Sequence, residues 1–329
     1  MSPSNTIAIV GATGNQGRSL AHAFLSLPDW HVRGLTRNPD SASAKALAAK
    51  GAELVQANLE DPESLSRAFA GATTIFVNTD FWAPYGAAMA SGETRERATQ
   101  IGFETELLHA KNAADAAAKI PTLRLFIYSA LGPMKTASGG KYSHSGHWDS
   151  KAAAADYIEK QIPELARKAS FVYPGAYHTN PLLYPHRSGD EWVHTMPGPI
   201  TTTFPVIDTE VTFGLLTRSL ILHEGPGVKL LACDCHVTIE QAIAAFKKFT
   251  GKSVRFQGVT MQQMVEITKL PLEVLEAAAY LSEYDFMDGV EGKVIRPADL
   301  KNKVETKTFD QILEQRGLDE VLQVQPPAL

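Results

Sequence analysis

The sequence predicts an α/β fold, in which a doubly wound parallel sheet is followed by a smaller C-terminal α/β lobe. Three observations carry this prediction. Through the first half of the 329 residues, short β-branched and apolar runs alternate with segments of helical spacing. Hydrophobic residues make up 44% of the chain, which is enough to bury a large core. After Pro174 the alternation weakens, and residues 181–205 are rich in proline, glycine and histidine.

The predicted strands and helices of the first half follow one another in pairs. We predict strands at 6–10, 31–36, 53–57, 74–78, 125–129 and 170–173. We predict helices at 20–27, 41–50, 95–119 and 149–161, and one that begins near Asp61. Pro62 and Glu63 support that last start, because proline and acidic side chains both suit the first turn of a helix. Right-handed crossovers then gather the carboxyl ends of the strands at one edge, where such folds bind ligands.

The second half is predicted to hold a smaller lobe that covers this edge. Residues 238–250 have the spacing of an amphipathic helix, with Thr238 as its cap. Residues 228–232 are predicted to return to the main sheet as a late strand. We therefore expect a dinucleotide-binding domain over 1–175 and a substrate or partner lobe over 176–329.

A glycine-rich turn follows the first predicted strand directly and leads into the first predicted helix. Gly11, Gly14 and Gly17 have the spacing GxxGxxG. The first glycine permits the tight turn, the second lets the backbone approach a pyrophosphate, and the third allows close helix–strand packing. The free N–H groups at the helix start then face the phosphates. The sequence thus predicts a Rossmann-like dinucleotide site formed by Gly11, Ala12, Thr13, Gly14, Asn15, Gln16 and Gly17.

The end of the second predicted strand decides between NAD and NADP. An acidic side chain there would accept a hydrogen bond from the ribose 2′-hydroxyl, whereas this chain has Arg37 followed by Asn38. A guanidinium offers a planar set of donors that matches a 2′-phosphate, so we predict NADP(H) as the cofactor. Arg33 is on the same strand and is expected to face away. Further cofactor contacts are predicted, from their positions after the third and fourth strands, for Asn58, Leu59, Thr79, Asp80 and Phe81.

These residues resemble the NmrA-like family, an atypical branch of the short-chain dehydrogenase superfamily. The segments that carry the resemblance are 9–17, 33–39, 126–129, 147–151 and 174–177, with Asn180. The resemblance implies NADP(H) binding, a single lysine, Lys151, at the start of a helix, and cofactor-side or substrate-side contacts from Pro174 and Tyr177. It does not select a chemistry, because the family contains both reductases and redox-sensing regulators without turnover.

The chain matches the catalytic arrangement of the superfamily in two of three positions. A short-chain dehydrogenase uses a tyrosine four residues before the lysine and a serine on the fifth strand. Here Lys151 and Ser129 are the candidates, but His147 stands at the tyrosine position. Three alternatives remain open: His147 acts as the general acid, Lys151 alone orients ribose and substrate, or the chain binds the dinucleotide without turnover.

Several nearby polar and aromatic residues have two interpretations each. Tyr142 and His144 supply an acid from a loop, or they are ordinary loop residues. His178 contacts a substrate at the cleft entrance, or it packs at the rim. Trp82 and Tyr85 form an aromatic wall over the nicotinamide, or they pack in the core or in a lid.

Charge, hydropathy and cysteine content exclude several classes of protein. The net charge is −5 and the basic residues are scattered, so no nucleic-acid partner is expected. No apolar run approaches the ~20 residues of a membrane span, and no signal or transit peptide is expected. We predict a cytoplasmic protein, with a nuclear pool as the alternative. Cys233 and Cys235 are too few for a disulfide framework, and the histidines lack metal-ligand spacing, so we expect no metal.

Two functions are consistent with these features. The first is an NADPH-dependent oxidoreductase that acts on a small organic substrate, in secondary metabolism. The second is a redox-sensing protein that binds NADP(H) and switches an interaction with a protein partner. The second is motivated by His147 at the tyrosine position. We favour the enzyme, because Ser129 and Lys151 are both present.

Overall fold

The structure is a computed structural model, and it describes residues 5–324. Its main element is an eight-stranded sheet in the order β14-β11-β6-β5-β4-β1-β2-β3, and all of its pairings are parallel. The strands are β1 (Asn5–Val10), β2 (Trp30–Thr36), β3 (Glu53–Gln56), β4 (Thr74–Val77), β5 (Leu125–Ser129), β6 (Ala169–Pro174), β11 (Lys229–Ala232) and β14 (Val294–Ile295). This confirms the predicted Rossmann-like fold. The strand order reverses between β1 and β4, which is the place where such sheets bind ligands.

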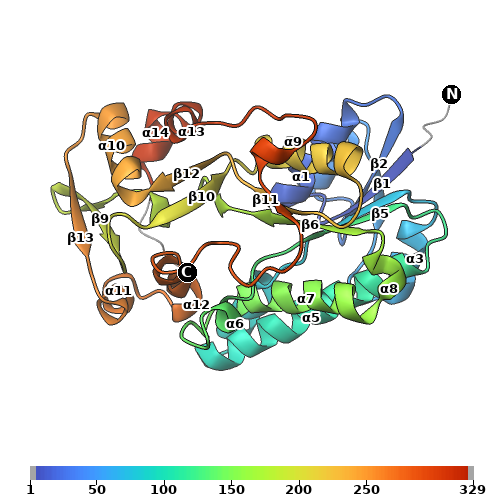
Figure 1. Cartoon of the computed structure of the whole chain (residues 1–329), viewed down its shortest axis with the longest axis horizontal. Helices are drawn as coiled ribbons and strands as arrows, with labels where there is room; N and C mark the ends of the chain where they lie inside the picture. The colour runs from blue at the N-terminus through green and yellow to red at the C-terminus, as the bar shows by residue number, and fades with distance from the viewer. Residues whose placement is uncertain (1–4, 325–329) are drawn as a thin grey trace.

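Helices cover both faces of this sheet and give the molecule three layers (Figure 1). On one face α1 (Asn15–Leu25) packs against α9 (Thr212–Ser219), and on the other α5 (Arg95–Ala118) packs against α7 (Gly146–Gln161). The remaining helices of the first half are α2 (Ala42–Ala48), α3 (Pro62–Phe69), α4 (Trp82–Ala90), α6 (Met134–Ala137) and α8 (Pro163–Ala166).

The two faces of the sheet bury different sets of apolar side chains, as strand geometry requires. In β5, Phe126 and Tyr128 belong to the core beside α5 and α7, whereas Leu125 and Ile127 belong to the core beside α1 and α9. Successive side chains of a strand point to opposite faces, so the position of a residue in β5 determines which face of the sheet its side chain lies on.

The smaller lobe lies at one end of the main sheet (Figure 1). It contains two three-stranded sheets, in the orders β12-β10-β7 and β13-β9-β8. Their strands are β7 (Ala176–Tyr177), β8 (His186–Ser188), β9 (Glu191–Met196), β10 (Thr203–Ile207), β12 (Cys235–Thr238) and β13 (Val254–Gly258). The helices are α10 (Ile239–Thr250), α11 (Met261–Thr268), α12 (Leu272–Tyr280), α13 (Phe309–Arg316) and α14 (Leu318–Leu322).

The second half of the chain contributes to both parts of the molecule. Strand β11 occupies the place predicted for a late strand, and β14 and α9 also join the main sheet and its helical layer. Helix α10 has the predicted cap, because the Thr238 hydroxyl accepts the backbone N–H of Gln241. The division of the chain at residue 175 stays a prediction.

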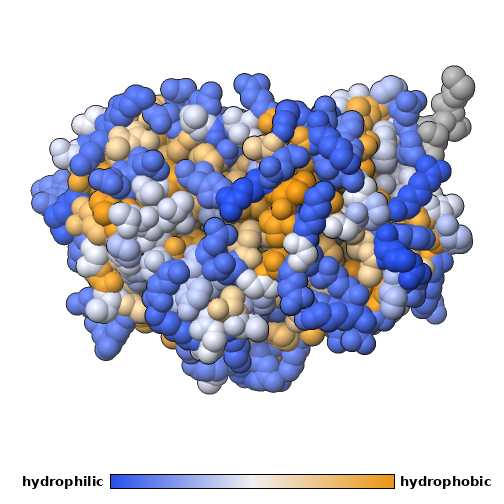
Figure 2. Space-filling model, in the orientation of Figure 1, coloured by the Kyte–Doolittle hydropathy of each residue, from blue (hydrophilic) through white to orange (hydrophobic). Residues whose placement is uncertain are grey.

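The surface and the helices give two further observations. Hydrophilic residues cover most of the face seen in Figure 2, and hydrophobic residues are gathered mainly near its centre. No helix within residues 5–324 is long and apolar enough to cross a membrane.

Candidate dinucleotide and catalytic site

A cavity of about 1010 Å³ opens at the carboxyl ends of the strands of the main sheet and extends beneath the smaller lobe. The glycine turn lies at one end, and the side chains of α12 lie at the other. The cavity has the size expected for a small-molecule or cofactor site. It is therefore the candidate site.

The glycine turn has the shape that a pyrophosphate requires. Gly11 has a φ of +73°, and a Cβ on Gly17 would lie 2.3 Å from the carbonyl oxygen of Gly11. No side chain caps the start of α1 at Gly14, so its N–H groups remain available to an anion. Of the seven residues predicted in this turn, Gly11, Thr13, Gly14 and Gln16 line the cavity, whereas Ala12, Asn15 and Gly17 do not. Ala12 and Gly17 are buried and set the packing of α1 on the sheet.

Gln16 presents a buried acceptor beside this turn. Its Nε2 donates to the hydroxyl of Tyr177 at 2.8 Å, while its Oε1 is buried with no hydrogen-bond partner within residues 5–324. Burial raises the pKa of Tyr177, so this hydroxyl stays protonated. A buried oxygen without a donor is costly, and a ligand hydroxyl or amide would satisfy it. The turn and Gln16 thus fit a dinucleotide.

Arg37 is exposed at the edge of the cavity. Its guanidinium makes no ion pair or hydrogen bond to another residue in the described part of the chain. Arg33 behaves differently, as predicted, because its Nε donates to Glu53 at 2.7 Å and its guanidinium donates to the carbonyl of Ala68. Arg37 is therefore the guanidinium available to a phosphate. The other residues that line this end are Thr36, Asn38, Ser41, Ser43, Asn58 and Leu59. Of these, Thr36, Ser41 and Ser43 were not predicted from the sequence.

The segment after β4 forms one wall of the cavity. Asp80 caps α4, because its Oδ1 accepts the backbone N–H of Trp82 at 2.9 Å. Phe81 and Trp82 line the cavity, and Tyr85 is buried behind them, with its ring stacked on Phe81 at 5.7 Å between centroids. Trp82 thus forms part of an aromatic wall, while Tyr85 supports it. Thr79 also lines the cavity and is buried.

Lys151 is held at the cavity by a buried carboxylate. Its Nζ lies 2.9 Å from Oε1 of Glu106, which is fully buried, and 3.1 Å from the carbonyl oxygen of Thr79. Glu106 also accepts hydrogen bonds from the hydroxyls of Thr79 and Ser150. The Tyr128 hydroxyl lies 2.9 Å from that of Thr79, and burial raises the pKa of Tyr128 well above its usual range. The result is a closed polar network that fixes the lysine ammonium.

Glu106 was not predicted as a site residue, although the sequence holds a signal for it. It lies on α5 in a row of buried small residues, Ala98, Gly102, Ala110 and Ala113, that repeats at helical spacing. A single carboxylate on such a buried face requires a charged partner, because an unpaired buried charge is very costly. The partner is Lys151.

His147 lies one helical turn before Lys151, because α7 begins at Gly146 rather than at the predicted Asp149. Its ring lines the cavity, 5.0 Å from the ring of Trp82 between centroids. Its Nδ1 is hydrogen-bonded to Oε1 of Glu273, a buried side chain on α12. The i, i+4 spacing therefore places both predicted catalytic side chains at the same cavity.

Ser129 does not lie at the cavity, which corrects its predicted role. It is fully buried, and its hydroxyl has no hydrogen-bond partner within residues 5–324. Because side chains alternate along β5, Tyr128 points toward Lys151 and Ser129 points to the opposite face of the sheet. It is the tyrosine of this strand that meets the lysine network.

The side chains of Tyr142, His144 and His178 make contacts away from the cavity. The Tyr142 hydroxyl donates to Glu283 at 2.9 Å, and burial raises the pKa of Tyr142. The Nδ1 of His144 lies 2.6 Å from Glu276. His178 is buried, and its carbonyl oxygen accepts the Tyr184 hydroxyl. None of these three residues lines the cavity. Pro174 and Tyr177, for which cofactor-side or substrate-side contacts are predicted, do line it.

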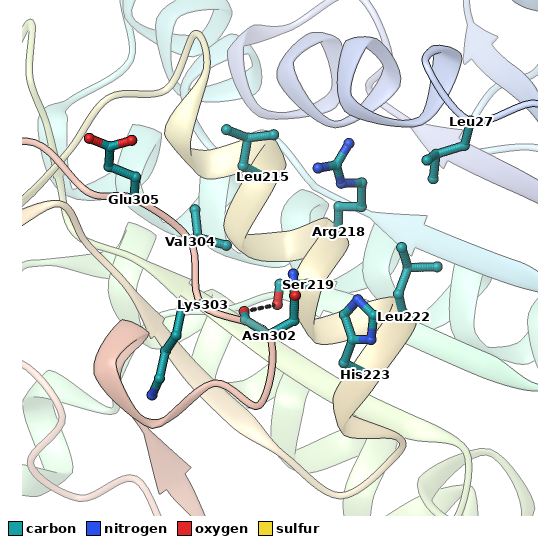
Figure 3. Close-up of a pocket in the computed structure, with 10 residues that line it drawn as sticks. All are labelled: Leu27, Leu215, Arg218, Ser219, Leu222, His223, Asn302, Lys303, Val304 and Glu305. Carbon is teal, nitrogen blue, oxygen red and sulfur yellow. Dashed lines mark hydrogen bonds between the residues drawn. The ribbon is translucent and has the colours of Figure 1, made fainter.

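A second cavity of about 400 Å³ lies between the end of α1, α9 and the segment after β14 (Figure 3). Its lining residues are Leu27, Leu215, Arg218, Ser219, Leu222, His223, Asn302, Lys303, Val304 and Glu305. The Ser219 hydroxyl donates to the carbonyl oxygen of Asn302, and the Lys303 and Glu305 side chains point apart. None of its charged side chains forms a pair with another across this cavity.

Comparison with known sequences shows the family to which the chain belongs and the proteins that it resembles. A sequence model of the NmrA-like family matches residues 3–313. An NmrA-like family domain-containing oxidoreductase of a Cladobotryum species is 32% identical over 221 residues, which are 67% of this chain and 57% of that protein. A protein of the same description from Penicillium ochrochloron is 27% identical over 282 residues, which span 77% of this chain and 75% of that protein. The first match thus spans less than two thirds of the relative.

Comparison with solved structures supports the fold. The NADP complex of NmrA, a negative transcriptional regulator, has a TM-score of 0.67 at 20% identity, over 99% of this chain and 96% of that one. Triphenylmethane reductase of Citrobacter sp., solved with NADP(H), has a TM-score of 0.67 at 16% identity, over 94% of this chain and 99% of that one. The first of these proteins is a regulator and the second is an enzyme, so the shared fold leaves the function to the site.

Proposed function

The chain belongs to the NmrA-like family, and from this premise we propose that it is an NADP(H)-dependent oxidoreductase with a small apolar organic substrate. One observation carries the proposal. His147 and Lys151 reach the same cavity as the glycine turn and Arg37. Titratable side chains at a cofactor cavity are the groups that proton transfer requires.

The cofactor is assigned to the end of the cavity formed by the turn. Gly11, Thr13 and Gly14 would hold the pyrophosphate at the start of α1, and Arg37 would hold the 2′-phosphate. Bound NADPH supplies the hydride. Comparison with NADP complexes of the same fold is consistent with this assignment.

Lys151 and His147 take different roles in this proposal. Glu106, Thr79 and Asn78 already surround the Lys151 ammonium at 2.9 to 3.3 Å, so its three N–H donors have partners. Lys151 therefore provides a fixed positive charge at the cavity. His147 uses Nδ1 for Glu273, which leaves Nε2 for a ligand. Of the three alternatives left open by the sequence, this arrangement favours His147 as the proton donor.

The far end of the cavity favours an apolar substrate. Its lining is mainly aromatic and aliphatic, with Trp82, Trp148, Phe204, Val274, Leu281 and Phe286. No lysine or arginine other than Arg37 and Lys151 lines the described cavity. Arg37 is assigned to the cofactor and Lys151 is paired with Glu106, so no lysine or arginine of the cavity is left to bind a substrate carboxylate.

A second candidate function is a redox-sensing regulator that binds NADP(H) and a protein partner. The observation that favours it is the histidine at the tyrosine position of the superfamily. Such a regulator would switch its interaction with a protein partner through loops that order on dinucleotide binding, without any chemical step.

Calorimetric titration with NADPH, NADP⁺, NADH and NAD⁺ tests the cofactor, and a panel of apolar ketones, enones and imines tests the reaction. The enzyme is expected to bind NADPH in preference to NADH and to oxidise it in the presence of at least one panel compound. Similar affinity for NADP⁺ and NADPH, with no oxidation of NADPH by any panel compound, would favour the regulator. An absence of dinucleotide binding would overturn both functions.

A further inference from the structure

Helix α12 of the smaller lobe carries two buried carboxylates that bind the segment before and at the start of α7. Glu273 accepts the backbone N–H groups of Gly146 and His147, each at 2.9 Å, and also bonds Nδ1 of the His147 ring. Glu276, one helical turn later, accepts the backbone N–H of His144 at 2.7 Å and lies 2.6 Å from its Nδ1. The exposed fractions of the two glutamates are 2% and 5%.

The Glu273 contact determines which ring nitrogen of His147 carries a proton. A carboxylate accepts hydrogen bonds and does not donate them, so the nitrogen that it contacts must be Nδ1–H. The remaining ring nitrogen, Nε2, is then the one available to a molecule in the cavity that His147 lines. The same carboxylate satisfies two N–H groups at the start of α7, so backbone and ring are fixed together.

We propose that Glu273 is a positioning residue for proton transfer by His147. It holds the ring with Nδ1–H toward α12 and Nε2 toward the substrate. This inference rests on the proposed oxidoreductase function. It also gives the smaller lobe a part in the reaction, because Glu273 is the contact between α12 and the ring.

The proposed step balances in atoms and charge. Hydride from NADPH forms the new C–H bond at a carbonyl carbon of the substrate, and the C=O π electrons move to oxygen. The Nε2–H proton of the imidazolium forms the O–H bond, which leaves neutral His147 with its proton on Nδ1. NADP⁺ and an alcohol are the products, and solvent returns a proton to Nε2. Glu273 remains a carboxylate throughout.

Glu276 provides a matched control. It lies on the same helix as Glu273 and makes the same two kinds of contact, to an imidazole Nδ1 and to a backbone N–H, although it accepts one backbone N–H where Glu273 accepts two. Its partner His144 differs, because the side chain is 54% exposed and does not line the cavity. If these contacts are purely structural, Glu273→Ala and Glu276→Ala should change kcat by similar factors. If Glu273 positions His147, only Glu273→Ala should lower kcat strongly.

The first test is the ring ¹⁵N spectrum of histidine-labelled protein, recorded without substrate in alkaline buffer where neutral tautomers are distinguished. His147 is expected to carry its proton on Nδ1 in the unmodified chain. Glu273→Ala should shift its population toward the Nε2–H tautomer, and Glu276→Ala should change the signal of His144 alone. A His147 ring that is already in the Nε2–H form would overturn the proposal. This first measurement needs no Glu273 variant, so it remains decisive if Glu273→Ala fails to fold.

The second test uses whichever panel compound is turned over. Glu273→Ala should lower kcat at least about tenfold, because a positioned general acid contributes about 10²–10⁴ to the rate. The KM for NADPH should stay within about twofold of the original value, since the cofactor contacts are elsewhere, and Glu276→Ala should change neither constant by more than that. Equal losses of kcat in the two variants would overturn the positioning role. If no compound is reduced while the Nδ1–H tautomer is observed, the oxidoreductase function fails and the Glu273–His147 contact stands.

Discussion

At the scale of single residues, the choice of cofactor depends on Arg37. It is an exposed arginine at the cavity edge with no partner for its guanidinium in the described chain. We expect Arg37→Ala to weaken NADPH binding by about 1.5–3 kcal/mol, the cost of losing hydrogen bonds to a charged group, and to leave NADH binding nearly unchanged. Titration calorimetry measures both. Arg67→Ala, which removes an exposed arginine on α3, is the control. Equal losses for NADPH and NADH would contradict the assignment of Arg37 to the 2′-phosphate.

The residues of the site differ in how far the sequence could predict them. The places of Gly11, Gly14 and Arg37 at the cavity were predictable, because they follow from neighbours in the chain and from the strand that each one follows. Ser129 was assigned to the wrong face, since a strand's alternation gives two faces but does not say which one meets the lysine. Glu273 was beyond local reasoning, because it lies 126 residues from the histidine that it contacts.

At the scale of secondary-structure elements, the glycine turn joins β1 to α1 through a close contact. A Cβ on Gly17 would lie 2.3 Å from the carbonyl oxygen of Gly11, so α1 must move away from the turn to accept it. We expect Gly17→Ala to destabilise the fold by about 1–3 kcal/mol, as overpacking does, and to weaken NADPH binding. Denaturant unfolding and calorimetry measure the two effects.

Gly86 on α4 is the matched control for this substitution. No atom lies within 4 Å of a Cβ built there, and alanine is favoured over glycine within a helix. Gly86→Ala should therefore raise the free energy of unfolding by about 0.5–1 kcal/mol and leave NADPH binding unchanged. If Gly17→Ala binds NADPH as tightly as the unmodified chain, the turn is not the pyrophosphate site.

A buried contact between Glu106 and Lys151, at 2.9 Å, links α5 to α7. We expect Lys151→Met to abolish hydride transfer and to cost about 3–5 kcal/mol of stability, because the fully buried Glu106 loses its countercharge. Adding Glu106→Gln should restore much of the stability but none of the activity. Thermal unfolding of the single and double variants measures the interaction free energy between Glu106 and Lys151. NADPH oxidation by the same variants measures the activity. Equal stabilities of the Lys151→Met single and double variants would contradict the charge pair.

The elements themselves were largely predictable, and their boundaries were less so. All six strands of the first half were predicted, since buried parallel strands are short apolar runs between helices. The start of α7 was predicted three residues late, at Asp149. The reason is that Glu273, from another part of the chain, accepts the N–H groups of Gly146 and His147 and extends the helix. A cap of this kind leaves no signal in the local sequence.

At the scale of the whole molecule, the two halves of the chain are interleaved. The second half supplies β11 and β14 to the main sheet and packs α9 against α1. It also supplies α12, whose glutamates bind the segment that leads into α7. Because these contacts cross residue 175, we expect the chain to unfold as one cooperative unit, although the sequence predicted two domains.

His194 on β9 of the smaller lobe provides a test of that cooperativity. Burial lowers the pKa of His194 from 6.5 to about 4, so the unfolded chain takes up this proton at a higher pH than the folded one. The neutral ring therefore makes its full contribution to the free energy of unfolding above about pH 6.5. That contribution, about 3 kcal/mol at most, is lost as the pH falls toward 4. His194→Phe should remove this part of the pH dependence, as measured by denaturant unfolding between these pH values.

Two variants that each keep a single tryptophan can show whether this pH effect reaches the whole fold. Trp30 lies on β2 of the main sheet and contacts Phe24, whereas Trp192 lies on β9 and contacts Phe246. In a chain that unfolds as one unit, acidification and His194→Phe must shift the transitions of both reporters equally, because each reports the same equilibrium. A shift confined to Trp192 would show that the smaller lobe unfolds by itself. In that case the boundary near residue 175 would separate two thermodynamic domains, and the contacts of α12 with the start of α7 would be too weak to couple them.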